Sequence, residues 1–228
     1  MIDILKSEDR GQADYGWLKA KYSFSFAHYY NPEFMGFRRL RVMNEDRIAA
    51  GGGFPTHPHH NMEIITYVMT GGLRHSDSLG NEGEIKPGII QRMSAGSGIR
   101  HSEENSTDQT THLYQIWLEP SDLDVEPSWE DVAIPETEGL RLIASPDGQN
   151  ESTKIHAPVK LWAGKICADE TLEYSLEAGR HGWLQVTHGE LTLNENNLHA
   201  GDGAAISDVS LLKMIATKDS QFLLFDLD

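Results

Sequence analysis

A short segment of the chain, FPTHPHHNMEII at residues 54–65, carries three histidines within four positions. On a β-strand, side chains two residues apart point to the same face, so His57 and His59 would share one face and His60 would take the other. Neutral imidazole nitrogens bind divalent transition-metal ions, and two of them on one face are suited to chelation. An HxH pattern in a proline-containing segment is common by chance, so this pair alone is a weak signal.

A second pair with the same spacing follows 44 residues after His57, in the segment GSGIRHSEEN, where His101 and Glu103 would share a face of another strand. If both strands line the inside of one barrel, three imidazoles and one carboxylate converge on one point. This mixed set of nitrogen and oxygen donors suits iron, nickel, cobalt, manganese, copper or zinc, and it leaves one or two positions open for water or substrate. Together, the two pairs predict a metal site.

Other residues compete for roles at this site. Glu63 lies an even number of residues after His59, so it would share the face of the HxH pair if the strand were unbroken, and it is an alternative to Glu103 as the carboxylate ligand. His75 and His112 are further candidates that strand register could bring near. For both histidines we favour a supporting position outside the ligand set, or one at the edge of the core.

The elements that position these residues are predicted to be strands. Short apolar and β-branched runs such as EIITYVM, KPGIIQRM and HLYQIWLEP recur between glycine turns. No window longer than about ten residues holds a helical period, and EPSWEDVAI at 126–134 is at best a short helical turn. The expected fold class is therefore all-β with few short helices.

The chain is predicted to contain two domains of the same style. The acidic, proline-bearing stretch at 119–135 is interpreted as a connector, and WLQVTHGELTLNENNLHAGDGAAI in the second half repeats the strand and turn pattern of the first. We expect two tandem barrels or sandwiches, an N-terminal metal-binding domain at 1–125 and a C-terminal domain at 126–228 without metal ligands. The second half has only single histidines beside glycines and turns, interpreted as exposed loop residues: His181, His188 and His199.

Composition excludes several classes of function. The formal charge of −16 and the single basic cluster, at 38–41, argue against direct nucleic-acid binding. No segment approaches the roughly 20 apolar residues of a membrane span, and the amino terminus has no signal-peptide pattern. We expect a soluble, cytoplasmic protein, with a monomer favoured. Cys167 is the only cysteine, so no internal disulfide can form, and it is interpreted as a buried structural thiol.

The two ligand-bearing segments carry a family resemblance. The run GGGFPTHPHHNME, followed by PGIIQRMSAGSGIRHSEEN, resembles the two metal-binding motifs of the cupin superfamily, and in detail it looks like the pirin family. FMGFRRLRVMNED and HLYQIWLEP are also similar to pirin-family segments. The resemblance spans nearly the whole chain and is strongest from about residue 20 to 118.

The first motif fits the general cupin pattern and the second departs from it. Motif one is matched by Gly51, His57, His59 and Glu63. In motif two, Ser94 stands where proline is usual and Ile99 where histidine is usual. The histidine comes two places late, at His101, and Asn105 moves in step with it, while Gly88 and Gly96 keep the glycine positions. This departure is itself the pirin pattern.

The resemblance implies a ligand set and an activity. Carried over by position, the metal ligands are His57, His59, His101 and Glu103, with Glu63 a nearby non-ligand, in a bicupin whose second half is metal-free. Bacterial pirin-like proteins resemble quercetin 2,3-dioxygenases. These metal-dependent enzymes open the central ring of a flavonol with O2 and release carbon monoxide. The resemblance implies a divalent metal in this protein, expected to be Fe2+, with nickel, cobalt, manganese, copper or zinc as alternatives. Glu103 is the candidate base for the flavonol proton, with Glu63 in reserve.

Two rival functions share these ligands. Eukaryotic members of the pirin family are thought to act as transcription cofactors, so a metal-binding regulatory protein or redox sensor without turnover is the alternative. A cupin isomerase or another ring-cleaving dioxygenase would differ only in the lining of the pocket. Candidate apolar walls near the ligand strands, which we interpret mainly as core, are Phe24, Phe26, Phe54, Met62 and Met93.

Overall fold

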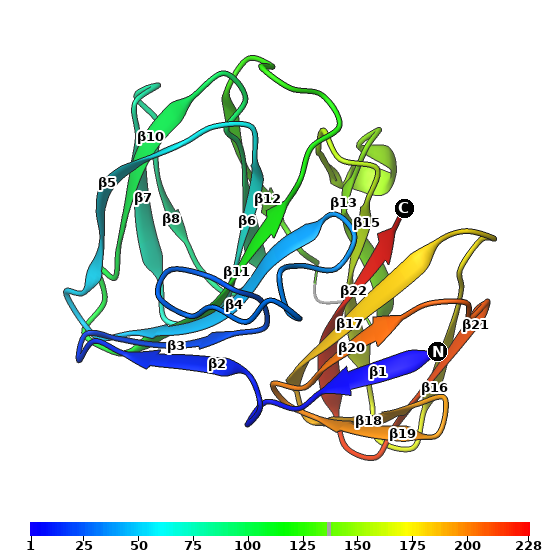
Figure 1. Cartoon of the computed structure of the whole chain (residues 1–228). Helices are drawn as coiled ribbons and strands as arrows, with labels where there is room; N and C mark the ends of the chain where they lie inside the picture. Colours follow the sequence, from blue (N-terminus) through cyan, green and yellow to red (C-terminus); the bar gives the residue numbers. More distant parts are fainter. Residues whose placement is uncertain (136–137) are drawn as a thin grey trace. The chain divides into compact units, whose positions relative to one another are not determined.

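The computed structural model describes residues 1–135 and 138–228, and they form two compact units (Figure 1). The N-terminal unit holds residues 11–135 together with 155–157, and the C-terminal unit holds the remaining described residues. Both units consist of strands, and within the described residues the one helix is a 3-10 turn, Gln149–Glu151. The predicted all-β class with two tandem domains is confirmed.

The N-terminal unit contains a seven-stranded and a four-stranded sheet, both antiparallel throughout. The seven-stranded sheet has the spatial order β12 (Ser128–Ala133), β9 (Ile89–Ser94), β6 (Glu63–Thr70), β11 (Thr111–Leu118), β4 (Leu40–Ile48), β3 (Leu18–Tyr22) and β2 (Gly11–Asp14). The four-stranded sheet has the order β5 (Gly53–His59), β10 (Ile99–Glu104), β7 (Leu73–Asp77) and β8 (Glu82–Ile85).

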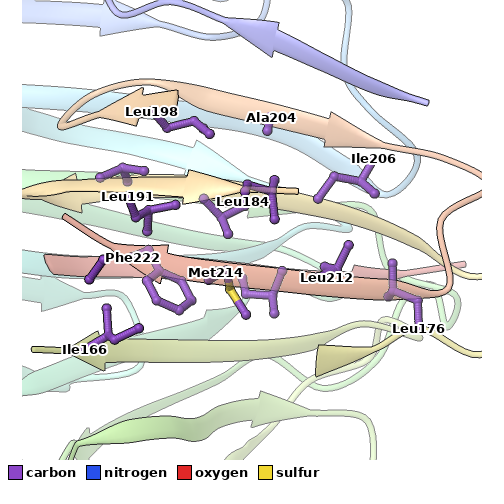
Figure 2. Close-up of a cluster of buried hydrophobic side chains, with 14 residues drawn as sticks. Ile166, Leu176, Leu184, Leu191, Leu198, Ala204, Ile206, Leu212, Met214 and Phe222 are labelled. Carbon is purple, nitrogen blue, oxygen red and sulfur yellow. The ribbon is translucent and has the colours of Figure 1, made fainter. Parts of the chain in front are cut away.

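The C-terminal unit repeats this division into sheets of seven and four strands. The larger sheet has the order β1 (Ile2–Leu5), β20 (Gly203–Ile206), β17 (His181–His188), β22 (Ser220–Leu227), β15 (Lys160–Ile166), β13 (Gly139–Ser145) and β14 (Thr153–Lys154). The smaller sheet has the order β16 (Thr171–Ser175), β21 (Leu211–Ala216), β18 (Glu190–Leu193) and β19 (Asn196–His199). Side chains from both sheets build its core, including Leu184 and Phe222 from the larger sheet and Leu191 and Met214 from the smaller (Figure 2).

The units begin and end elsewhere than the predicted domains at 1–125 and 126–228. Strand β1 pairs with β20, so the first residues of the chain lie in the C-terminal unit, and β12 pairs with β9 in the N-terminal unit. The position of the domain boundary stays a prediction. The expected helical turn at 126–134 is wrong, because this segment forms strand β12, on which Trp129 packs against a cluster that contains Met93.

The single cysteine differs from its expected environment. Cys167 is partly exposed rather than buried, and its thiol donates a hydrogen bond of 3.2 Å to Glu138 Oε1, a bond that raises the pKa of the thiol. Within the described residues, no helix has the length and apolar character needed to cross a membrane. The cytoplasmic location stays a prediction.

Strand β5 lies at the edge of its sheet, which explains how it accommodates two prolines. Proline donates no backbone hydrogen bond and is therefore confined to edge strands and bulges. The register between β5 and β10 shifts between His101, which pairs with His57, and Glu103, which pairs with Phe54. This places one extra residue in β5, beside Pro55.

The glycine at the start of β5 has a packing reason. A methyl group on Gly53 would overlap the backbone carbonyl of Glu103 on β10, so only glycine permits this close approach of the two strands. Gly51 is different, because a methyl group there would meet nothing within 4 Å, although its φ of 70° is in the left-handed region.

We therefore predict that Gly53→Ala destabilises the protein by about 3 kcal/mol through overpacking, and that it accelerates hydrogen exchange of the β5 amides. The control Gly51→Ala carries only the cost of left-handed backbone, about 1 kcal/mol. Urea unfolding and amide exchange measure the two effects. Equal stability and equal exchange in the two variants would contradict overpacking as the cause.

Candidate metal centre

Three histidines from two neighbouring strands come together in the N-terminal unit. His57 and His59 lie on β5, and His101 lies directly opposite His57 on β10. The ring centroids are 4.8 Å apart for His57 and His59, 4.4 Å for His57 and His101, and 4.9 Å for His59 and His101. One nitrogen from each ring lies within 4.8 Å of the other two. The alternation of side chains along a strand thus produces the predicted shared face.

The hydrogen bonds of these rings indicate which nitrogen faces the centre. His57 Nδ1 lies 2.8 Å from the carbonyl oxygen of Pro55, so we assign the proton to Nδ1, which leaves Nε2 as a free lone pair. His101 Nδ1 lies 3.4 Å from His75 Nδ1, whereas His101 Nε2 is buried and has no hydrogen-bond partner. A buried polar nitrogen without a partner is costly, and a metal ion at this position would satisfy it.

Burial keeps two of the three imidazoles, those of His59 and His101, in the neutral form that binds metals. Desolvation, reinforced by the neighbouring His57, lowers the pKa of His59 to about 4. Desolvation, reinforced by His57, His59 and His75, lowers the pKa of His101 to about 2. These two rings therefore present lone pairs at neutral pH.

Glu103 lies beside His101, with only 3% of its surface exposed. Its carboxylate accepts hydrogen bonds of 3.2 Å at each oxygen from Gln115 Nε2, and Thr66 Oγ1 lies 3.4 Å from Oε1. Burial raises the pKa of Glu103 to about 7, against the opposing effect of these hydrogen bonds. Glu103, His101 and His75 each offer an atom within 4.8 Å of the others. The carboxyl is thus held in place, and in the metal-free protein it keeps its proton to a higher pH than an ordinary glutamate.

Two of the competing candidates, Glu63 and His112, lie outside this group, as does His60. Glu63 is on β6 in the other sheet, because the chain turns between His59 and Glu63, and it accepts a hydrogen bond of 2.8 Å from Ser94 Oγ. His60 is exposed and lies 3.1 Å from Asp124, and His112 lies 2.9 Å from Glu45. Among the described residues, none of these three side chains belongs to a group that could hold a metal ion.

A small cavity of about 50 Å³ opens at the histidines. Two of the apolar candidates from the sequence line this cavity, Phe26 and Phe54. The other three do not: Phe24, Met62 and Met93. Residues that the sequence did not single out complete the lining: Asn44, Asp46, Ile64, Gln115 and Trp117. They come from β4, β6 and β11 of the seven-stranded sheet, and no local motif marks them.

A larger hollow of about 230 Å³ adjoins this cavity and is mostly apolar. The two spaces share Phe26, Asn44, Asp46 and Phe54, so these four residues form a common wall. Trp17 lines the larger hollow and meets Phe54 edge to face, with 5.2 Å between ring centroids. Aromatic walls of this kind suit a flat aromatic ligand.

The donor set fits a divalent transition-metal ion. Three imidazoles in one group, with a carboxylate beside His101, are donors that iron, nickel, cobalt, manganese, copper and zinc accept, and the unpartnered His101 Nε2 needs a partner. The C-terminal unit differs, because among its described residues the one group with metal-ligand spacing is Glu138, Cys167 and Glu170, which contains no histidine.

Two tandem all-β units, one of which sets an HxH pair opposite an HxE pair, define a bicupin. The family model described as Pirin matches residues 5–118, and the model described as the quercetinase C-terminal cupin domain matches residues 142–227. The chain belongs to the pirin family.

Known proteins similar to the chain extend over its whole length. A protein of Escherichia coli strain K12 named quercetin 2,3-dioxygenase is 44% identical over 228 residues, covering 100% of this chain and 99% of the relative. A pirin-like protein of Caulobacter vibrioides is 41% identical and covers 99% of each chain. The crystal structure of the E. coli pirin YhhW in complex with nickel(II) has a TM-score of 0.97 at 44% identity and covers 100% of this chain and 99% of that one. The expected resemblance to the pirin family and its quercetin 2,3-dioxygenase-type members is confirmed.

The raised pKa of Glu103 predicts a pH effect on the stability of the metal-free protein. Between pH 4.5, the ordinary pKa of a glutamate, and about 7, the folded state holds a proton that the unfolded state has released, so stability falls as the pH rises through this window. The shift corresponds to about 3 kcal/mol. Glu103→Gln removes the titrating carboxyl of residue 103. After a chelator has removed any metal, the variant should be more stable than the parent by up to about 3 kcal/mol above pH 7 and nearly equal to it at pH 4.5.

Urea unfolding of the chelated proteins at a series of pH values measures this difference. The histidines act in the opposite direction, losing stability as the pH falls, but they are common to both proteins and cancel. The control is Glu104→Gln, since the neighbouring Glu104 is exposed and pairs with Arg74. A difference between Glu103→Gln and the parent that does not change with pH would contradict the raised pKa of Glu103.

Proposed function

We propose that the chain is a metal-dependent dioxygenase that opens the central ring of a flavonol such as quercetin with O2 and releases carbon monoxide. The observation that carries the proposal is the convergence of three histidines and a buried carboxyl on a cavity with aromatic walls. Full-length identity of 44% to a protein named quercetin 2,3-dioxygenase supports the same activity.

The proposed ligands of the metal are His57, His59, His101 and Glu103. The nickel(II) complex of the related E. coli pirin supports a divalent metal ion as the cofactor. Fe2+ is our first choice for the native ion because it supports chemistry with O2, although this donor set also accepts nickel, cobalt, manganese, copper and zinc. A divalent ion with one carboxylate and three neutral imidazoles would supply a net positive charge that favours the deprotonated flavonol.

Glu103 is the proposed base. A flavonol hydroxyl must lose its proton on binding, and Glu103 is a buried carboxylate at the cavity that can accept it. Hydrogen bonds from Gln115 to both oxygens orient the carboxylate, and we propose that one oxygen binds the metal while the other exchanges the proton. Glu63 remains the reserve candidate from the sequence, but its position on β6 and its bond to Ser94 do not favour it.

The remainder of the cavity would hold the flat rings. Phe26, Phe54 and Trp117 supply apolar walls, and the adjoining hollow gives space beyond the small cavity at the histidines. Asn44, 2% exposed, lines both spaces, and its Oδ1 has no hydrogen-bond partner. A phenolic hydroxyl is the kind of group that would satisfy this buried oxygen.

His57→Ala should abolish flavonol oxidation because it removes a proposed ligand. The assay follows the loss of flavonol absorbance under air, together with carbon monoxide release, in chelated protein reloaded with each candidate metal. His60→Ala is the matched control, since His60 is a sequence neighbour that lies outside the histidine group. We expect at least a hundredfold loss of turnover for His57→Ala and parental turnover for His60→Ala.

The absence of turnover with any metal would overturn the dioxygenase proposal. If the protein nevertheless binds one metal ion through His57, the result would support the alternative of a metal-binding regulatory protein. Equal turnover of His57→Ala and the parent would remove the histidine group from the activity altogether.

A further inference from the structure

A further histidine, His75, lies beside His101, with 5.1 Å between the ring centroids, and the proposed chemistry does not use it. His75 is on β7, next to β10 in the four-stranded sheet, and its side chain is fully buried. In the register of these strands, Glu103 pairs with His75 and His101 pairs with Asp77. Two buried titratable groups of β7 therefore lie across from two proposed ligands.

The three side chains form a chain of polar contacts. His101 Nδ1 lies 3.4 Å from His75 Nδ1, and His75 Nε2 lies 3.5 Å from Asp77 Oδ2. If His101 binds a metal through Nε2, its proton must be on Nδ1, where it is donated to His75 Nδ1. His75 then carries its own proton on Nε2 and donates it to Asp77. Each proton has one place, so the tautomers of both rings are fixed.

Hydrogen bonds hold Asp77 in place at the far end of this series of contacts. The Asp77 side chain is inaccessible to solvent and accepts hydrogen bonds from the backbone of Leu79, at 2.9 Å, and from the backbone and side chain of Asn81, at 3.0 and 2.9 Å. His75 is stacked on Trp129, with the ring planes 19° apart and the centroids 5.8 Å apart. Neither Asp77 nor the His75 ring can turn without breaking these contacts.

We propose that Asp77 and His75 form a relay that orients the His101 ring and strengthens its Nε2 as a metal donor. The negative charge of Asp77, passed through two hydrogen-bonded imidazoles, increases electron density on the liganding nitrogen. His57 lacks such a relay, because its Nδ1 donates to a neutral backbone carbonyl. Of these two ligands, His101 is the one whose donor strength the protein sets from a distance. This inference rests on the metal role of His101 in the proposed function.

Two competing roles for His75 are separable from the relay by the same variants. His75, His101 and Glu103 offer atoms close enough to form a ligand group of their own, so His75 could be a ligand itself. His75 could also act only by filling space against Trp129. The relay requires the negative charge of Asp77 as well as the His75 ring, direct ligation requires a His75 nitrogen but not Asp77, and packing requires only a ring.

The test is the affinity of chelated protein for Co2+ and Ni2+, measured by competition with a chromophoric chelator. The visible spectrum of the Co2+ form reports the ligand field without any turnover. Asp77→Asn removes the negative charge at the far end of the relay and keeps a side chain of nearly the same shape, and His75→Phe keeps a ring and loses both nitrogens. Circular dichroism and urea unfolding of the metal-free proteins establish that each variant is folded.

The relay predicts that Asp77→Asn and His75→Phe each weaken metal binding about 10- to 100-fold and shift the Co2+ spectrum. A loss in His75→Phe with parental affinity in Asp77→Asn would make His75 a ligand and overturn the relay. Parental affinity in His75→Phe, with or without a loss in Asp77→Asn, would reduce its role to packing and would overturn the relay as well. If the parent protein itself binds no metal, the proposed function is wrong, and this result differs from every outcome that concerns the variants alone.

Discussion

The pairing of β5 with β10 in one particular register is the constraint on which the rest of the site depends. His57 stands opposite His101 only in this register, and a slip of one residue would turn one strand's histidines to the other face of the sheet. Gly53 permits the close approach of the two strands, and the bulge beside Pro55 sets Glu103 against Phe54. The glycines and prolines around the HxH pair thus place the ligands without binding anything themselves.

Burial gives the site its chemistry once the register has brought the side chains together. Two of the three imidazoles are kept neutral because a charged ring would be poorly solvated, and the carboxyl of Glu103 holds its proton to about pH 7 for the same reason. A cation bound at this place would favour the ionised carboxylate and would occupy the free nitrogen of His101. The metal-free protein therefore contains a polar cluster whose unfavourable features are those that a divalent ion relieves.

The sequence predicted the residues with a local pattern and missed those placed by strands distant in the chain. The HxH and HxE pairs identified a shared face because alternation along a strand is local, and the structure brings the three histidines together with Glu103 beside His101. Trp117, Gln115 and Asn44 reach the cavity from other strands, and only the order of those strands, which no short motif encodes, places them there.

The errors have similar causes. Segment 126–134 is too short for its period to separate a turn from a strand, and pairing with β9 decided it. Apolar context suggested a buried Cys167, but its position just after β15 leaves it partly exposed. The sequence favoured a supporting position for His75 but did not identify its partner, because its contact with His101 exists only through the pairing of β7 with β10.

X-ray absorption spectroscopy of the protein loaded with one equivalent of nickel or cobalt tests the central claim most directly. Coordination by the three histidines and Glu103 predicts a shell of nitrogen and oxygen atoms at about 2.0–2.2 Å, with the outer-shell scattering of three imidazole rings. A spectrum with one imidazole or none would contradict it.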